Sequence, residues 1–423
     1  MPSLGTCLIR THLEDPFTAI FEIGSNSPLS PLFMRLLVET QIKSRRIIVY
    51  LASFLFSFHL ALPLYINSSF LAHFFSEKLI GIIYAGGSLL TLFALSEYPR
   101  VLNKFGNYKA IVSLFFLEIL ALLLLATSDG GTFVMVAFIL SQVFITLGYF
   151  SFDVFLERYT REETTGAVRG TLLTVSNIAI LLGPLVTGII LTDNEFWKIY
   201  LVSATVLFVV FLLSFNLKDF KDPLYDRVPF FQKIRRVFFA KHPHDGIRHV
   251  AIANFLMMFF YSWMVIYTPL YLYQYVGFSW GEIGIILPVM LLPFILFEFV
   301  LGKLIDRGGS ARLIIVVGFF ITALFTLSLF FINSTSLVLW AILLFGTRVG
   351  MSFVEIASET YFFKHIRSKD TNLLSIFRDT QPIAYLLGPL LGSFFLAFLG
   401  MHYLFLLLGA FMLAGALNSS RMK

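Results

Sequence analysis

Long apolar stretches separated by short polar segments run along most of the chain. A helix that crosses a membrane needs about 20 mostly apolar residues, because a hydrocarbon core of roughly 30 Å is crossed at about 1.5 Å per residue. Stretches this long, rich in Leu and Phe, favour helices over the short alternating strands of a membrane barrel. The pattern predicts an all-α membrane protein with twelve transmembrane helices. The predicted spans are residues 47–66, 79–96, 110–127, 133–156, 170–192, 197–216, 249–272, 281–301, 313–331, 337–361, 373–398 and 401–417.

Lys and Arg residues are sorted between alternate loops. Of the 31 basic residues, 27 fall in one set of loops and tails, while Lys78 and Lys198 fall in the opposite set and Arg348 and Arg378 lie inside spans. Cytoplasmic loops of membrane proteins carry the excess of Lys and Arg. The alternation therefore predicts that both termini are cytoplasmic, and it supports an even number of spans.

The composition agrees with a membrane location. Apolar residues make up 58% of the chain and charged residues 13%, against about a quarter charged in soluble domains. This composition excludes a disordered chain, a disulfide scaffold and a nucleic-acid binder. The sequence has no phosphate-binding loop and no Cys or His cluster with metal spacing, so we expect no cofactor. The net charge of +6 reflects the sorting of basic residues and does not indicate an acidic partner.

An internal repeat relates the two halves of the chain. Ile178–Leu185 and Ile383–Leu390 match at seven of eight positions, and Pro63–Tyr65 returns as Pro269–Tyr271. The repeated pairs keep the same order, at offsets between 201 and 206 residues. A repeat of six helices gives two halves with the same orientation in the membrane.

The repeat and the loops divide the chain into five segments. The first tail lacks the pattern of a signal peptide, and Met34 within it is an alternative start. The linker between the halves holds eight Lys or Arg residues and an amphipathic pattern that predicts a helix lying on an anionic membrane face. The segments are a cytoplasmic tail (1–45), a six-helix half (46–216), the basic linker (217–248), a second six-helix half (249–417) and a cytoplasmic tail (418–423).

The loop Gly302–Arg312 carries a specific motif. It matches the pattern Gly-x-Leu-x-Asp-Arg-x-Gly-x-x-Arg, the signature loop of the major facilitator superfamily, at every defined position. The counterpart in the first half, Pro99–Lys109, is degenerate but keeps a basic residue at Lys104. From residue 46 to 417 the chain resembles this family. The resemblance implies two halves that rock about a midplane site, with the first, fourth, seventh and tenth helices lining the cavity.

The resemblance also implies a conformational gate on the cytoplasmic side. Asp306 would face a helix N-terminus, while Arg307 would pair with one of two glutamates on the tenth helix, and a similar set would act in the first half. The alternative is that these charges serve folding and topology alone. The gate candidates are Gly302, Asp306, Arg307, Gly309, Glu355 and Glu359, with Lys104, Asp153 and Glu157 in the first half.

Polar and aromatic residues within the spans are candidates for the substrate cavity. An Arg in hydrocarbon costs about 3 kcal/mol or more, so Arg348 must face protein or water. It either binds an anionic solute or pairs with Glu355 or Asp379. His59 either carries protons or packs with a hydrogen bond. The cavity candidates are Ser57, His59, Tyr261, Trp263 and Arg348, and the candidates for proton coupling are His59, Glu355 and Asp379.

These features predict a secondary active transporter of a small solute that works by alternating access. Gly183-Pro184 resembles the family's antiporter motif with two of its glycines replaced, which favours proton-coupled efflux. One alternative is a sensor or assembly factor with this fold and no net transport. Another is an intramembrane enzyme, which would need paired carboxylates or a metal cluster. We expect a monomer in a plasma or bacterial inner membrane, with a solute, protons and lipid as its partners and no nucleic acid.

Overall fold

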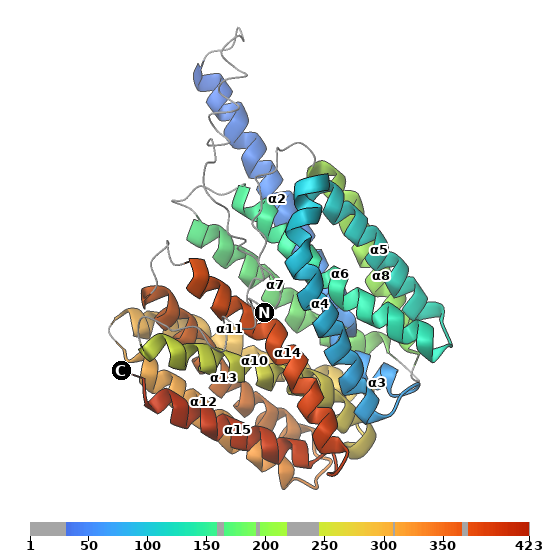
Figure 1. Cartoon of the computed structure of the whole chain (residues 1–423), viewed down its shortest axis with the longest axis vertical. Helices are drawn as coiled ribbons and strands as arrows, with labels where there is room; N and C mark the ends of the chain where they lie inside the picture. Colours follow the sequence, from blue (N-terminus) through green and yellow to red (C-terminus); the bar gives the residue numbers. More distant parts are fainter. Residues whose placement is uncertain are drawn as a thin grey trace.

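The computed structural model describes residues 31–158, 165–191, 195–217, 245–307, 309–365 and 371–422 (Figure 1). Within these ranges the secondary structure is helical, without a strand. The long helices are α2 (Pro31–Leu64), α4 (Glu77–Phe105), α5 (Asn107–Thr127), α6 (Gly131–Arg158), α7 (Thr165–Ile190), α8 (Phe196–Ser214), α10 (Asp245–Tyr271), α11 (Trp280–Asp306), α12 (Ala311–Phe330), α13 (Leu337–His365), α14 (Thr371–Leu396) and α15 (Tyr403–Ser420). Short helical turns follow at α3 (Asn67–Leu71), η2 (Phe215–Leu217) and η3 (Leu272–Val276).

Every predicted span coincides with a helix, and the prediction of an all-helical membrane protein is confirmed. Within the described residues, ten helices are long and apolar enough to cross a membrane. The other two predicted spans lie on α7 and α14, whose described apolar parts, Thr174–Ile190 and Thr380–Leu396, are shorter. The exact count of twelve spans therefore stays a prediction. Helix α2 begins at Pro31, inside the predicted first tail, whereas residues 1–30 and most of the linker lie outside the described residues.

Helix packing repeats between the two halves of the chain. In the first half α2 packs on α7 and α8, α5 on α6 and α8, and α4 on α6. The second half repeats these pairs in the same order, as α10 with α14 and α15, α12 with α13 and α15, and α11 with α13. Across the halves α4 packs on α14 and α7 packs on α11 (Figure 1). The sequence repeat is thus matched by a repeat in packing.

The glycine of each Gly-Pro pair explains one contact in each half. A Cβ added to Gly183 would lie 2.7 Å from the backbone of Ala61, which brings α7 close to α2. Gly388 holds the equivalent place against Ser262 and brings α14 close to α10. Small residues allow helix backbones this close an approach in a membrane, so the repeated Gly-Pro pairs fix the same packing twice.

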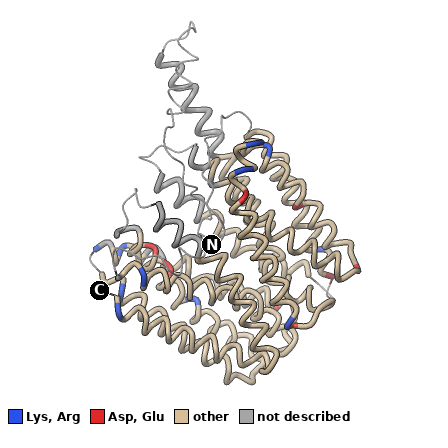
Figure 2. Tube along the Cα trace, viewed as in Figure 1, with Lys and Arg blue, Asp and Glu red and all other residues tan. Residues whose placement is uncertain are grey.

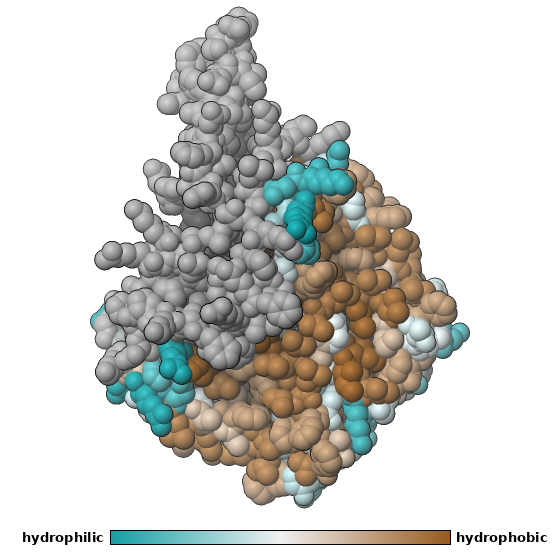
Figure 3. Space-filling model, viewed as in Figure 1, coloured by the Kyte–Doolittle hydropathy of each residue, from teal (hydrophilic) through white to brown (hydrophobic). Residues whose placement is uncertain are grey.

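Apolar side chains cover the outside of the bundle. Figure 3 shows hydrophobic residues over the described flanks and hydrophilic residues gathered toward the ends. Ile189 is 72% exposed and Phe398 75% exposed, which is unfavourable in water and favourable against lipid tails. Described Lys and Arg residues gather near the helix ends at the upper and left margins of Figure 2. This distribution is that of a protein whose middle lies in a bilayer.

The two halves meet closely at one end, which we call the closed end and define by Glu77, Gly81, Gly188, Tyr275 and Gly284. A Cβ added to Gly188 would lie 2.7 Å from the Cα of Gly284, so α7 and α11 touch through their backbones. A Cβ added to Gly81 would lie 2.6 Å from a backbone oxygen of α14. The Tyr275 hydroxyl donates a hydrogen bond of 2.6 Å to Glu77 Oε1. These contacts join the halves at the end opposite the signature loop.

Candidate functional site

A cavity of about 760 Å³ lies between the two halves. Helices α2 and α7 of the first half and α10, α11, α13 and α14 of the second contribute to its wall. The polar and charged residues of the wall are Tyr65, Asn177, Tyr261, Arg348, Glu355, Gln381 and Tyr385.

Arg348 is the only basic residue in the wall of this cavity among the described residues. Its side chain is 1% exposed, and the guanidinium carbon lies 5.1 Å from the ring centres of both Phe260 and Tyr261. Its Nε and Nη1 atoms have no hydrogen-bond partner. Buried polar atoms are nearly always paired. The arrangement leaves donors in the cavity wall that an anionic group can satisfy.

Glu355 does not neutralise Arg348. The two residues lie on α13, seven positions apart, which is roughly 10 Å along the axis at about 1.5 Å per residue, and the structure records no ion pair between them. Glu355 Oε2 instead accepts a hydrogen bond of 2.7 Å from the Tyr261 hydroxyl. The side chain of Asp379, the other predicted partner, lies outside the described residues.

A second cavity, of about 1130 Å³, adjoins the first within the amino-terminal half. Leu64, Val265, Gln381 and Tyr385 line both cavities. Its wall comes from α2, α4, α5, α6 and α8, closed by residues of α10 and α14. The polar residues of the amino-terminal half in this wall are His59, Asn67, Tyr84, Ser88, Thr91, Glu118, Ser141, Gln142, Thr146, Tyr149, Tyr200 and Ser203.

A buried glutamate and a buried histidine line this second cavity. Glu118 is 1% exposed; its Oε1 accepts a hydrogen bond of 2.6 Å from Ser141 Oγ, and its Oε2 has no partner. His59 is fully buried, and its Nδ1 is hydrogen-bonded to the Phe56 carbonyl oxygen. A carbonyl can only accept, so Nδ1 carries the proton, which assigns a lone pair to Nε2 of the neutral ring. His59 Nε2 also has no partner.

The predicted cavity residues therefore separate into three groups. Tyr261 and Arg348 line the first cavity, and His59 lines the second. Ser57 lines neither; its buried hydroxyl accepts a hydrogen bond of 3.1 Å from the Tyr149 hydroxyl. Trp263 also lines neither, since its Nε1 donates a bond of 2.6 Å to the Gly388 carbonyl. The latter two make packing contacts between helices.

The described parts of the signature loop show a close turn. A Cβ added to Gly309 would lie 2.7 Å from the Leu304 carbonyl oxygen, to which the Gly309 amide donates a bond of 3.0 Å. A Cβ at Gly302 would reach Ile356 only at 3.9 Å, an ordinary contact. Close approach thus requires glycine at the turn itself and not at the end of α11.

The predicted gate charges are only partly within the described residues. Arg307 is exposed, and Glu359 is half-buried. Lys104 is exposed and lies 5.1 Å from the Phe105 ring centre. The side chains of the predicted acidic partners lie outside the described residues; these partners are Asp153, Glu157 and Asp306. The ion pairs of the gate therefore stay predictions.

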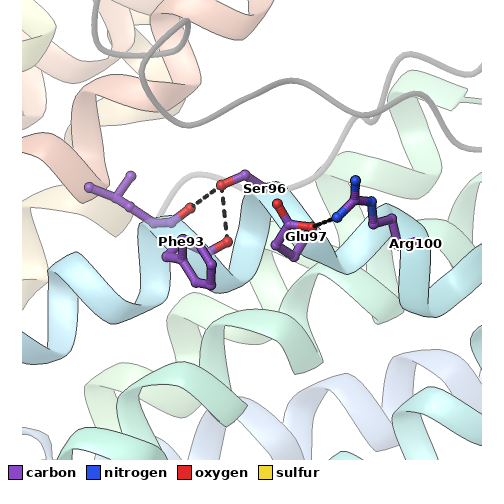
Figure 4. A network of polar contacts seen from close by, with 5 residues as sticks. Phe93, Ser96, Glu97 and Arg100 are labelled. Atoms are coloured by element: carbon purple, nitrogen blue, oxygen red, sulfur yellow. Dashed lines mark hydrogen bonds and ion pairs between the residues drawn. The ribbon is translucent and has the colours of Figure 1, made fainter.

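A local ion pair lies near the carboxyl-terminal end of α4. Arg100 Nη1 and Glu97 Oε2 are 2.6 Å apart, one helical turn from each other (Figure 4). Ser96 donates hydrogen bonds to the carbonyl oxygens of Leu92 and Phe93 in the preceding turn. The Arg100 side chain is 63% exposed, and such exposed pairs contribute at most about 1 kcal/mol. The pair therefore orders the helix end only weakly.

Glu118 is the main functional candidate that the sequence analysis missed. It is the only charged residue in the predicted span 110–127. The argument that singled out Arg348, that a charge within a span is costly and therefore used, applies equally to it. No group of three or more His, Cys, Asp or Glu among the described residues is placed to hold a metal ion.

The chain belongs to the Major Facilitator Superfamily, which matches residues 46–373 and, in a second match, residues 250–420. The resemblance inferred from the signature loop is thereby confirmed. The family and the apolar helices place the protein among multi-pass membrane transport proteins. No curated protein matches the chain in sequence.

Solved structures of transporters share the fold. The chain is similar to the peptide transporter POT in complex with alafosfalin, with a TM-score of 0.71, 12% identity and coverage of 89% of this chain and 93% of that one. It is similar to the nucleoside transporter NupG, with a TM-score of 0.66, 12% identity and coverage of 89% and 98%. It is also similar to a bacterial homologue of the human lysosomal transporter Spinster in an inward-facing, unoccupied conformation, with a TM-score of 0.63, 10% identity and coverage of 90% and 93%. At these identities the likeness concerns the fold alone.

Proposed function

We propose that this protein is a secondary active transporter that moves a small solute with an anionic group across the membrane by alternating access. The observation that carries the proposal is Arg348, a buried guanidinium with two unpaired nitrogens in the wall of a cavity between the halves. An uncompensated charge in a membrane interior is expensive. A carboxylate or phosphate-like group of the solute would neutralise it and satisfy its donors.

Alternating access by two six-helix halves is supported by the repeated packing and by the closed end. Backbone contact between Gly188 and Gly284 and the Tyr275–Glu77 hydrogen bond join the halves at one end. If the bundle has twelve spans with cytoplasmic termini, as the basic loops predict, this conformation faces inward. Transport then requires these contacts to break while the signature loop closes the cytoplasmic end.

Proton-coupled efflux is the finer form of the proposal. Of the three predicted proton carriers, Glu355 lines the cavity of Arg348 and His59 lines the adjoining cavity. Glu355 is the better placed, because binding and release of a proton there would change the charge of the wall that receives the solute. The antiporter-like Gly183-Pro184 supports export.

The test is uptake into proteoliposomes that contain the purified protein, over a panel of anionic, neutral and cationic solutes, with and without a pH gradient. We expect flux of one or more solutes that carry a carboxylate or phosphate-like group. A change of flux with the pH gradient supports proton coupling, and flux that is the same with and without the gradient rules out proton coupling. Absence of flux for every solute, with ligand binding retained, would instead favour a sensor or assembly factor.

A further inference from the structure

The second cavity has unpaired polar atoms in its wall. Glu118 Oε2 and His59 Nε2 have no hydrogen-bond partner, and both residues are buried. Among the described residues of the wall there is no Lys or Arg. The acidic group comes from α5 and the imidazole from α2, so the fold places residues far apart in the sequence in the wall of one cavity.

The Glu118 carboxyl group has less hydrogen bonding than its burial requires. Its one described partner is the Ser141 hydroxyl, at 2.6 Å from Oε1. A buried carboxylate is stable only when it is paired with a positive charge or with several donors. A ligand that carries positive charge and N–H donors would supply both, whereas an anion would add repulsion.

The wall of the second cavity is also partly aromatic. Tyr84, Phe138 and Tyr149 line it, and the rings of the first two meet edge to face at 4.8 Å. Faces of aromatic rings attract organic ammonium groups. A buried carboxyl group with an unpaired oxygen, an imidazole acceptor and aromatic walls together match a protonated amine.

We propose that this cavity binds the protonated amino group of the transported solute, with Glu118 as its charge partner and His59 Nε2 as a second acceptor. The cavity shares Gln381 and Tyr385 with the cavity of Arg348. A solute seated in both would place its amine at Glu118 and its anionic group at Arg348. The solute class is therefore a zwitterion, and this part rests on the function proposed above.

The test compares binding of matched alkylamines, alkanoates and ω-aminoalkanoates of increasing chain length to the full-length protein in detergent, by isothermal calorimetry. For one chain length the wild type should bind the ω-aminoalkanoate more tightly than either singly charged analogue. Glu118→Gln keeps the acceptor for Ser141 but removes the charge. It should weaken binding of alkylamine and ω-aminoalkanoate about tenfold or more, and leave the alkanoate unchanged.

Two further variants make the result decisive. Asp129→Asn removes the same charge from an exposed position on the loop after α5 and should bind all three ligands as the wild type does. Arg348→Met should lose the alkanoate and keep the alkylamine. If Glu118→Gln leaves the alkylamine affinity unchanged while Arg348→Met abolishes alkanoate binding, the proposed amine site is wrong and the proposed anion site stands. If Arg348→Met leaves the alkanoate affinity unchanged, the proposed function itself fails.

Discussion

Replacement of Arg348 by methionine separates the two roles that an arginine in a span can have. If Arg348 is held for a solute, its charge is uncompensated in the empty protein. Such a charge at the centre of a span costs about 3 kcal/mol, and attraction to the rings of Phe260 and Tyr261 returns about 1 kcal/mol. Arg348→Met removes both and fills the space with an apolar chain, so we expect the unfolding free energy to rise by about 2 kcal/mol.

If Arg348 instead belongs to a buried ion pair, Arg348→Met should lower the unfolding free energy. Removing one partner of a buried ion pair leaves the other charge exposed to a low-dielectric interior and costs about 3–5 kcal/mol. The assay is denaturant unfolding in mixed micelles, followed by tryptophan fluorescence, beside anion binding to the same preparation. Arg348→Lys, which keeps the charge and loses the planar fork, should keep the wild-type stability within about 1 kcal/mol and bind anions more weakly. A strongly destabilised Arg348→Met would refute the reasoning and assign the residue to a structural pair.

Three further predictions concern the movement of the halves. Gly188→Leu places a side chain against the backbone of α11 and should cut transport about tenfold, since overpacking costs about 1–3 kcal/mol. Gly86→Leu is the control and should transport normally, because an added Cβ there meets nothing within 4 Å. Equal transport by the two variants would contradict the closed end. Cysteines in place of Glu77 and Tyr275, in a chain without its native cysteine, should be linked by a short thiol crosslinker that stops transport reversibly; undiminished transport by the linked protein would rule out opening at that end. Asp306→Asn should insert into the membrane normally and transport poorly, and normal transport would remove the gate role of the loop.

The fold could be predicted from the sequence because the bilayer imposes a simple rule. Each span must be long and apolar, and basic residues must stay on one side, so hydropathy and loop charge together predicted a helix at every span. The weak cases are α7 and α14. In both helices the described side chains begin only partway along, at Thr174 and Thr380, so the apolar stretch that can be compared with a span is shorter.

The clearest predictor of the site was a single charged residue that breaks the apolar pattern. Arg348 does so, and it lines the cavity between the halves. Ser57 and Trp263 were chosen by their place on cavity-lining helices, but side-chain direction around a helix decides contact, and both bond within the packed bundle. Glu118 stands on α5, outside the helices that the family resemblance selects. The cavity reaches it because α5 packs directly on α6 and α8.

Counterflow in proteoliposomes tests the central claim most directly. Vesicles loaded with an unlabelled carboxylate solute and diluted into a trace of the labelled solute should accumulate label transiently, because one carrier site alternates between the two faces. We predict accumulation by the wild type and none by a folded Arg348→Met. Accumulation by Arg348→Met equal to that of the wild type, or no accumulation with any carboxylate-bearing solute, would contradict a transporter that binds the anionic group of its solute at this residue.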